Sequence, residues 1–118
     1  MNVFLVFWTP LLADAAIGSR DWKWPVPATN RLSSCYLDGR AHYALDLSAG
    51  GGSSIYASYP GEVIYVYKGC TYDYGKSGNC LCGKCGNLGN SVYIKHNYKG
   101  AWYVSRYGHM RTVNVSVG

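Results

Sequence analysis

Hydrophobic and polar positions alternate along the chain in short stretches, and no amphipathic helix of useful length follows residue 20. Each stretch is rich in β-branched or aromatic residues and ends at turn residues, a pattern typical of β-strands. The pattern predicts strands over residues 43–47, 55–58, 62–68, 91–96, 101–107 and 112–117. The sequence therefore predicts an all-β fold.

The hydrophobicity of two stretches predicts how they are buried. Residues 62–68 are almost all apolar, β-branched or aromatic, which indicates a central, well-buried strand. In residues 91–96, Val92 and Ile94 share one face with His96. This placement predicts that His96 packs inside the protein or supports a ligand, and is not a metal ligand itself.

Turn residues separate these stretches. Pro60 and Gly61 occupy the two central positions of the sequence Tyr-Pro-Gly-Glu, an order that suits a type II turn. Residues 97–100 read Asn-Tyr-Lys-Gly and predict a hairpin turn between two antiparallel strands.

Composition narrows the class of function. The 118 residues suffice for one domain, and a hydrophobic fraction of 48% with 14% charged residues is not that of a disordered segment. Glu62 is the only glutamate beside five aspartates, so few carboxylate pairs are available for glycosidase chemistry. No glycine-rich phosphate-binding motif occurs. The net charge of +5 is spread without a run, which is compatible with an anionic partner, such as an acidic cell-wall polymer or nucleic acid, and equally with a solvated surface of mixed charge. Nucleic acid is not expected as a partner, because charge alone would support it.

The first residues raise the question of export. Residues 3–13 are apolar, but a membrane-spanning helix needs about 20 such residues, so we expect no membrane span. Ala13-Asp14-Ala15 has the form of a signal-peptidase site, although no Lys or Arg precedes the apolar run. Residues 1–21 are therefore either an export signal or the tail of an upstream segment, and residues 22–118 form the domain.

One short motif carries candidate metal chemistry. Residues 42–46 read His-Tyr-Ala-Leu-Asp, and neutral imidazole and carboxylate are both ordinary zinc ligands. On a straight strand, positions four apart lie about 13 Å from each other. If His42 and Asp46 bind one ion, the chain must bend between them, with His42 on a loop and Asp46 on a strand. Gly39 makes such a loop plausible.

An ordered set of motifs resembles the lysostaphin/LytM-type zinc endopeptidases, which cleave peptide bonds in bacterial peptidoglycan. The resemblance runs from about residue 24 to the end of the chain. It implies a mainly antiparallel β-sheet fold with a narrow groove, closed by loops, over a single zinc. The matching stretches are residues 24–27 (WPVP), 39–47 (GRAHYALDL), 55–57 (IYA), 61–63 (GEV), 92–97 (VYIKHN) and 107–110 (YGHM).

The resemblance assigns three residues. His42 and Asp46 match the first two zinc ligands, and His109 matches a catalytic histidine that activates water or stabilises the tetrahedral intermediate. The family's third ligand belongs to a later His-x-His pair, which this sequence lacks, and we expect it beyond Gly118. The resemblance thus implies an incomplete catalytic domain, with little or no activity by itself, because a catalytic zinc needs three protein ligands.

The implied protein is a zinc endopeptidase that acts on the peptide cross-links of peptidoglycan. Its location would be extracellular, in the cell wall or on a phage virion. The alternative is a non-catalytic module of the same fold, which binds the cell wall or activates another hydrolase. A third interpretation is a small interaction domain centred on the cysteine-rich stretch.

That stretch, residues 69–90, is an insertion relative to the family pattern. Cys70, Cys80, Cys82 and Cys85 fall within 16 residues. A disulfide-bonded loop, a structural zinc site and free thiols all stay open, and the export interpretation favours disulfides. Cys35 stands apart and is expected to be a small buried apolar residue.

Overall fold

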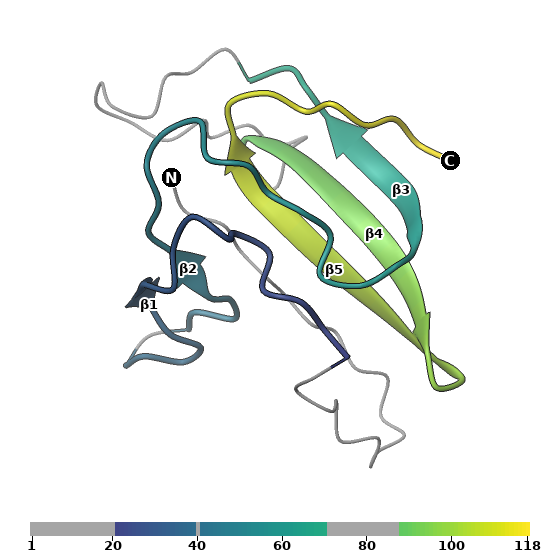
Figure 1. The fold of residues 1–118 in the computed structure, drawn as a ribbon, viewed down its shortest axis with the longest axis horizontal. Helices are drawn as coiled ribbons and strands as arrows, with labels where there is room; N and C mark the ends of the chain where they lie inside the picture. The colour runs from purple at the N-terminus through teal and green to yellow at the C-terminus, as the bar shows by residue number, and fades with distance from the viewer. Residues whose placement is uncertain (1–20, 40, 71–87) are drawn as a thin grey trace.

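The computed structural model describes residues 21–39, 41–70 and 88–118, which form two antiparallel β-sheets (Figure 1). These ranges contain no helix, so the prediction of an all-β fold is confirmed. None of the residues described here builds a helix that could cross a membrane. The strands are β1 (Leu32–Ser34), β2 (Asp46–Leu47), β3 (Glu62–Tyr67), β4 (Asn90–Tyr98) and β5 (Ala101–Met110).

The larger sheet has the order β3-β4-β5, so the central strand is β4. The prediction that residues 62–68 form the central, well-buried strand is therefore wrong. All six residues of β3 are exposed or half-buried, because the strand lies at the edge of the sheet. The chain after β5 turns back towards β3, where the Gly118 backbone NH donates to the Val63 carbonyl at 3.1 Å (Figure 1).

The β4–β5 hairpin confirms the turn predicted at residues 97–100. Tyr98 pairs with Ala101, and the two residues between them have positive φ, 50° at Lys99 and 82° at Gly100. Positive φ at both central positions defines the type I′ turn, whose twist matches that of the strands it connects.

Two other predicted strands are absent from the described ladders. Residues 55–58 and 112–117 have no strand assignment, and strand pairing within residues 43–47 is limited to β2. Residues 55–58 instead run beside the extended segment that precedes β1, where two backbone bonds join them. The Tyr56 NH donates to the Pro25 carbonyl at 2.8 Å, and the Lys23 NH donates to the Ser58 carbonyl at 2.7 Å. Their β-type composition therefore reflects extended chain that packs over the sheet.

Gly61 has a role that differs from the predicted one. It is not among the residues with positive φ, which the second central position of a type II turn requires, so that turn prediction is wrong. A Cβ on Gly61 would lie 2.4 Å from the Lys95 carbonyl oxygen and 2.7 Å from His96 Nδ1. A glycine is needed here because the chain passes directly against β4.

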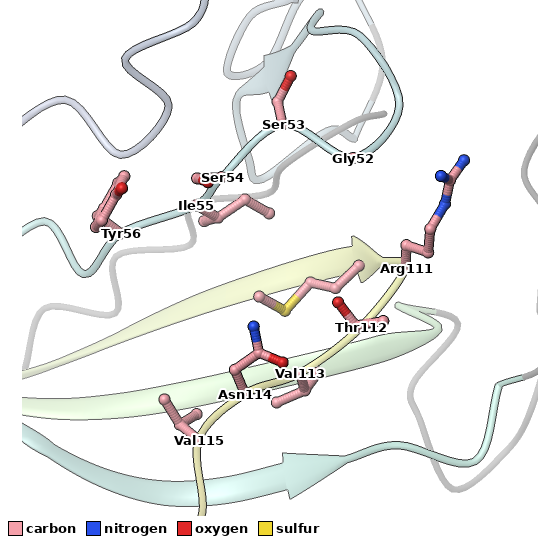
Figure 2. A pocket seen from close by; sticks show the side chains of 11 residues that line it. Gly52, Ser53, Ser54, Ile55, Tyr56, Arg111, Thr112, Val113, Asn114 and Val115 are labelled. Carbon is pink, nitrogen blue, oxygen red and sulfur yellow. The ribbon is translucent and has the colours of Figure 1, made fainter.

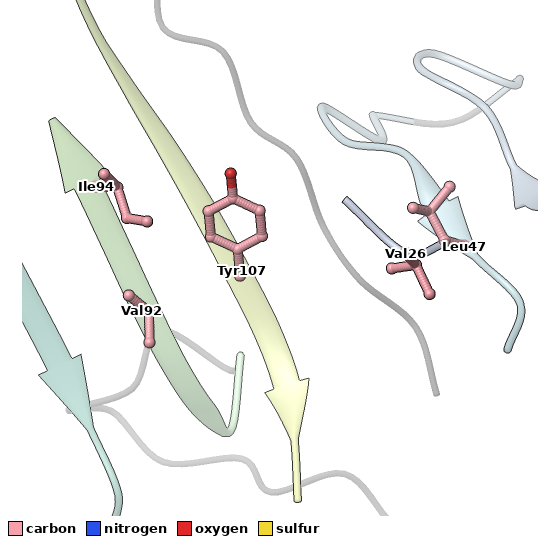
Figure 3. Close-up of a cluster of buried hydrophobic side chains, with 5 residues drawn as sticks. All are labelled: Val26, Leu47, Val92, Ile94 and Tyr107. Carbon is pink, nitrogen blue, oxygen red and sulfur yellow. The ribbon is translucent and has the colours of Figure 1, made fainter. Parts of the chain in front are cut away.

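The hydrophobic core lies between the two sheets (Figure 3). Val92 and Ile94 of β4 and Tyr107 of β5 pack with Val26 and Leu47, all of them buried. Figure 1 shows the chain between β2 and β3 crossing this face of the larger sheet. The core therefore holds β2 in a fixed position relative to β5. Asp46 is the first residue of β2, and His109 is the last residue but one of β5.

His96 is a packed histidine, as predicted. It is fully buried, and Trp22 packs edge-on against its ring at a centroid distance of 5.0 Å. Nδ1 lies 3.0 Å from the Pro60 carbonyl and therefore carries the proton, while Nε2 accepts a hydrogen bond from the Ser105 hydroxyl at 2.7 Å. Burial lowers the pKa of His96, because desolvation disfavours the imidazolium.

Candidate metal centre

The chain bends between β1 and β2 and brings His42 back to Asp46. Leu37 and Gly39 have φ values of 51° and 90°. The Leu37 NH donates to the His42 carbonyl at 2.7 Å and closes the loop. His42 thus lies on a loop and Asp46 begins β2, which is the bend that a shared ion requires.

The two candidate ligands face each other. His42 Nε2 lies 3.2 Å from Asp46 Oδ1, and both side chains are about nine-tenths buried. Two zinc ligands with bonds of about 2.0–2.1 Å at a tetrahedral angle lie about 3.3–3.4 Å apart. The spacing and the types of donor therefore fit two ligands of one zinc ion with almost no movement.

The surroundings of His42 select the tautomer that a metal ligand needs. Nδ1 lies 2.8 Å from the Cys35 carbonyl, which can only accept, so Nδ1 carries the hydrogen. The lone pair of the neutral ring is then on Nε2, which faces Asp46. Metal-binding histidines commonly donate their other ring NH to a carbonyl or a carboxylate in this way.

A carboxylate also lies on the Nδ1 side of His42. Asp38 Oδ1 is 3.9 Å from Nδ1, and Asp38 Oδ2 accepts a hydrogen bond from the Ser34 hydroxyl. The sequence pattern did not indicate Ser34, Asp38 or the Cys35 carbonyl as supports of His42. A backbone carbonyl leaves no signal in a sequence, and the spacing of Asp38 becomes meaningful only when the turn is known.

His109 lies in the same region, at the end of β5. Its φ of 55° is unusual for a residue other than glycine, and its backbone NH donates to the Leu88 carbonyl at 2.6 Å. Burial lowers the pKa of His109, and the negative charge of Asp46 acts in the opposite direction. The imidazole is thus close enough to sense the Asp46 carboxylate, so the three residues predicted from the sequence share one region.

A full set of zinc ligands is not assembled. Within residues 21–39, 41–70 and 88–118, no group of three or more His, Cys, Asp or Glu side chains could hold a metal ion. The third ligand, expected beyond Gly118, stays a prediction, as do the roles of His42, Asp46 and His109.

The cysteines differ in state. Cys70 is disulfide-bonded. Cys35 is an exposed free thiol, so the prediction that it is buried is wrong. It follows β1 at the start of an exposed loop, where its carbonyl, rather than its side chain, contributes to the site. Cys80, Cys82 and Cys85 lie outside the described residues, as does the candidate export signal up to residue 20.

Comparisons with known proteins give one relative and no family. No protein-family model matches the chain, and no solved structure matches it. The chain is 32% identical over 102 residues to the "Uncharacterized lipoprotein YgeR" of Escherichia coli (strain K12), which covers 86% of this chain. It spans about a third of that relative's length, 33%. The match therefore provides a longer relative whose activity is not described by its name.

Proposed function

We propose that the chain belongs to a zinc endopeptidase that cleaves the peptide cross-links of bacterial peptidoglycan. His42 and Asp46 are the zinc ligands it contributes, and His109 is its catalytic histidine. The observation that carries the proposal is the 3.2 Å approach of His42 Nε2 to Asp46 Oδ1 across a bent loop. The ordered resemblance of residues 24–110 to the lysostaphin/LytM-type enzymes supports the choice of reaction.

The chain's own residues have defined tasks in this reaction. His42 and Asp46 hold the ion, and the Cys35 carbonyl keeps Nε2 of His42 available for it. Bound zinc would polarise the scissile carbonyl and lower the pKa of water. Because burial lowers its pKa, His109 is uncharged at neutral pH and can accept a proton, which it then returns to the leaving amine.

The substrate places the reaction at the cell envelope. The name of the Escherichia coli relative describes a lipoprotein, which supports an envelope-associated location for this chain as well. We infer that it acts on the cell wall, outside the cytoplasm. A disulfide at Cys70 is consistent with an oxidising compartment.

The second candidate is a non-catalytic wall-binding module of the same fold. The observation that favours it is that the described residues gather only two of the three ligands that a catalytic zinc requires. The two candidates differ in whether a longer protein with a third donor cleaves cross-links.

Metal binding tests the proposed site directly. We expect the chain to bind one equivalent of zinc weakly in calorimetry, and His42→Gln and Asp46→Asn to weaken it at least tenfold. Asp21→Asn is the matched control, because Asp21 accepts a hydrogen bond from Tyr98 and pairs with Lys99, and none of its described interactions involves His42 or Asp46. Cobalt in place of zinc reports the ligand type, since only thiolate ligands give a strong sulfur-to-metal charge-transfer band.

The outcomes separate the candidates. Unchanged metal binding in both variants, or a thiolate spectrum that they leave unaltered, would overturn the proposed site. Zinc bound at His42 and Asp46 in a longer protein that never cleaves cross-links would favour the wall-binding module. Zinc-dependent cleavage of cross-links by that protein would support the endopeptidase. We expect little or no cleavage by the 118 residues alone.

A further inference from the structure

A pocket of about 380 Å³ lies between the loop after β2 and the chain that leaves β5 (Figure 2). One wall is formed by residues 52–56 and the other by residues 110–115. Met110 directly follows His109, so the pocket begins one residue from the proposed catalytic histidine. None of the interactions assigned above to the metal centre uses its lining residues.

The lining combines an apolar base with charge at one end. Ile55, Met110 and Val113 pack against the protein core. Figure 2 shows Arg111 at the end near Gly52, while Tyr56, which is 60% exposed, lies at the opposite end. The pocket is therefore elongated, with a cation at one end and an aromatic ring at the other.

Arg111 is positioned by the turn that faces it. A Cβ on Gly51 would lie 3.2 Å from a terminal nitrogen of the Arg111 guanidinium, so the absence of a side chain at Gly51 leaves room for this group. Among the residues that the structure describes, Arg111 forms no ion pair with a carboxylate. Its planar donor array thus remains available for a carboxylate from another molecule.

The walls provide backbone for an extended ligand. Residues 53–56 and 112–115 have no strand assignment, so they are not part of the ladders of either sheet. The Ser53 and Tyr56 NH groups already donate to the Gly50 and Pro25 carbonyls, so pairing with a ligand would use the other NH and carbonyl groups of the walls. Extended backbone at the side of a pocket can pair with an added peptide strand through NH and carbonyl groups. Figure 2 also shows the side chains of Thr112 and Asn114 between the two walls, where they supply further polar groups.

We propose that this pocket binds an extended peptide whose free C-terminal carboxylate is held by Arg111. The proposal rests on the proposed function, because it places a peptide substrate next to His109. It adds a substrate class, peptides with a free carboxylate, and names Arg111 as the residue that recognises it. Peptide backbone along the walls supplies affinity, and the charge pair supplies the selection for the free acid.

Titration of the zinc-free, isotope-labelled chain with tri-alanine and with its C-terminal amide tests the proposal by NMR. We expect the free acid to bind about two- to fivefold more tightly than the amide, the range for an exposed ion pair. The shifted resonances should lie in residues 52–56 and 110–115. Arg111→Gln should remove the preference for the acid, and Arg111→Lys should retain only part of it.

Arg31→Gln is the matched control, because it removes another exposed guanidinium, one that does not line the pocket. Equal affinities for acid and amide, shifts elsewhere, or a preference that survives in Arg111→Gln would overturn the proposal. Because Arg111 is exposed, its variants should fold, which their spectra without peptide would show. The NMR titration contains no metal, so its result is independent of zinc binding. If the chain prefers the free acid but calorimetry shows no zinc binding at His42, the proposed function is rejected and the pocket proposal is not.

Discussion

Replacing His96 by leucine tests how the larger sheet is held together. Leucine keeps the apolar contact with Trp22 but leaves the Pro60 carbonyl and the Ser105 hydroxyl without the imidazole. A buried polar group that loses its partner costs about 1–3 kcal/mol. With two such groups, we expect His96→Leu to lower the free energy of unfolding at pH 7.5 by about 2–6 kcal/mol.

The same residue makes stability depend on pH. Burial lowers the pKa of His96 and of His109 in the folded chain below the ordinary histidine value of 6.5. As the pH falls, the unfolded chain therefore takes up protons before the folded chain does. The stability that depends on the uncharged histidines is complete above pH 6.5 and is lost as the pH falls below it. Each histidine contributes a slope of at most about 1.4 kcal/mol per pH unit.

Urea unfolding of the wild type and of His96→Leu at pH 7.5, 6.5 and 5.5 measures both effects. The variant should lose the part of the acid-induced destabilisation that is due to His96 and keep the part due to His109. Adding Ser105→Ala to His96→Leu should restore about 1–2 kcal/mol of the free energy of unfolding at pH 7.5, because it removes the hydroxyl that has lost its partner. A single variant within about 0.5 kcal/mol of the wild type, or one with an unchanged pH slope, would refute the reasoning.

Two further substitutions test close contacts by the same unfolding measurement. Gly61→Ala should cost about 2–3 kcal/mol or prevent folding, because its Cβ would lie 2.4 Å from the Lys95 carbonyl oxygen. Gly50→Ala is its control and should be nearly neutral, since the nearest atom to that Cβ is 3.9 Å away. Asn90→Ala should cost about 1–3 kcal/mol, because its amide makes two hydrogen bonds to the Cys70 backbone, at 2.8 and 2.9 Å. Equal losses in both glycine variants, or a neutral Asn90→Ala, would contradict these contacts.

The pattern of hydrophobic and polar residues correctly predicted those parts of the fold in which the residues of a strand determine which of its faces is buried. In β4, alternation placed Val92, Ile94 and His96 on the buried face, and the adjoining hairpin turn was also correct. The position of β3 in the sheet could not be predicted, because an apolar strand can have the same sequence pattern at the centre of a sheet and at its edge. Which of the two it occupies depends on the order of the strands in space.

The candidate site divides in a similar way. His42, Asp46 and His109 were identified as candidates from the chemistry of their side chains and from the order of the motifs, and the structure places them in one region. The supports of His42 are a backbone carbonyl at Cys35 and a carboxylate at Asp38, which approach only through positive-φ turns. A sequence pattern contains no direct record of such contacts.

The cysteine-rich insertion and the candidate site are physically connected. The insertion joins β3 to β4, and its base is closed by the hydrogen bonds between Asn90 and the Cys70 backbone. Just before Asn90, the Leu88 carbonyl accepts a hydrogen bond from the His109 NH. A left-handed backbone conformation at a residue other than glycine costs about 1–2 kcal/mol, so His109 needs such a partner to keep its φ of 55°. An interaction role for the insertion and a catalytic role for His109 are therefore not independent, because a ligand that displaced Leu88 would also move the imidazole.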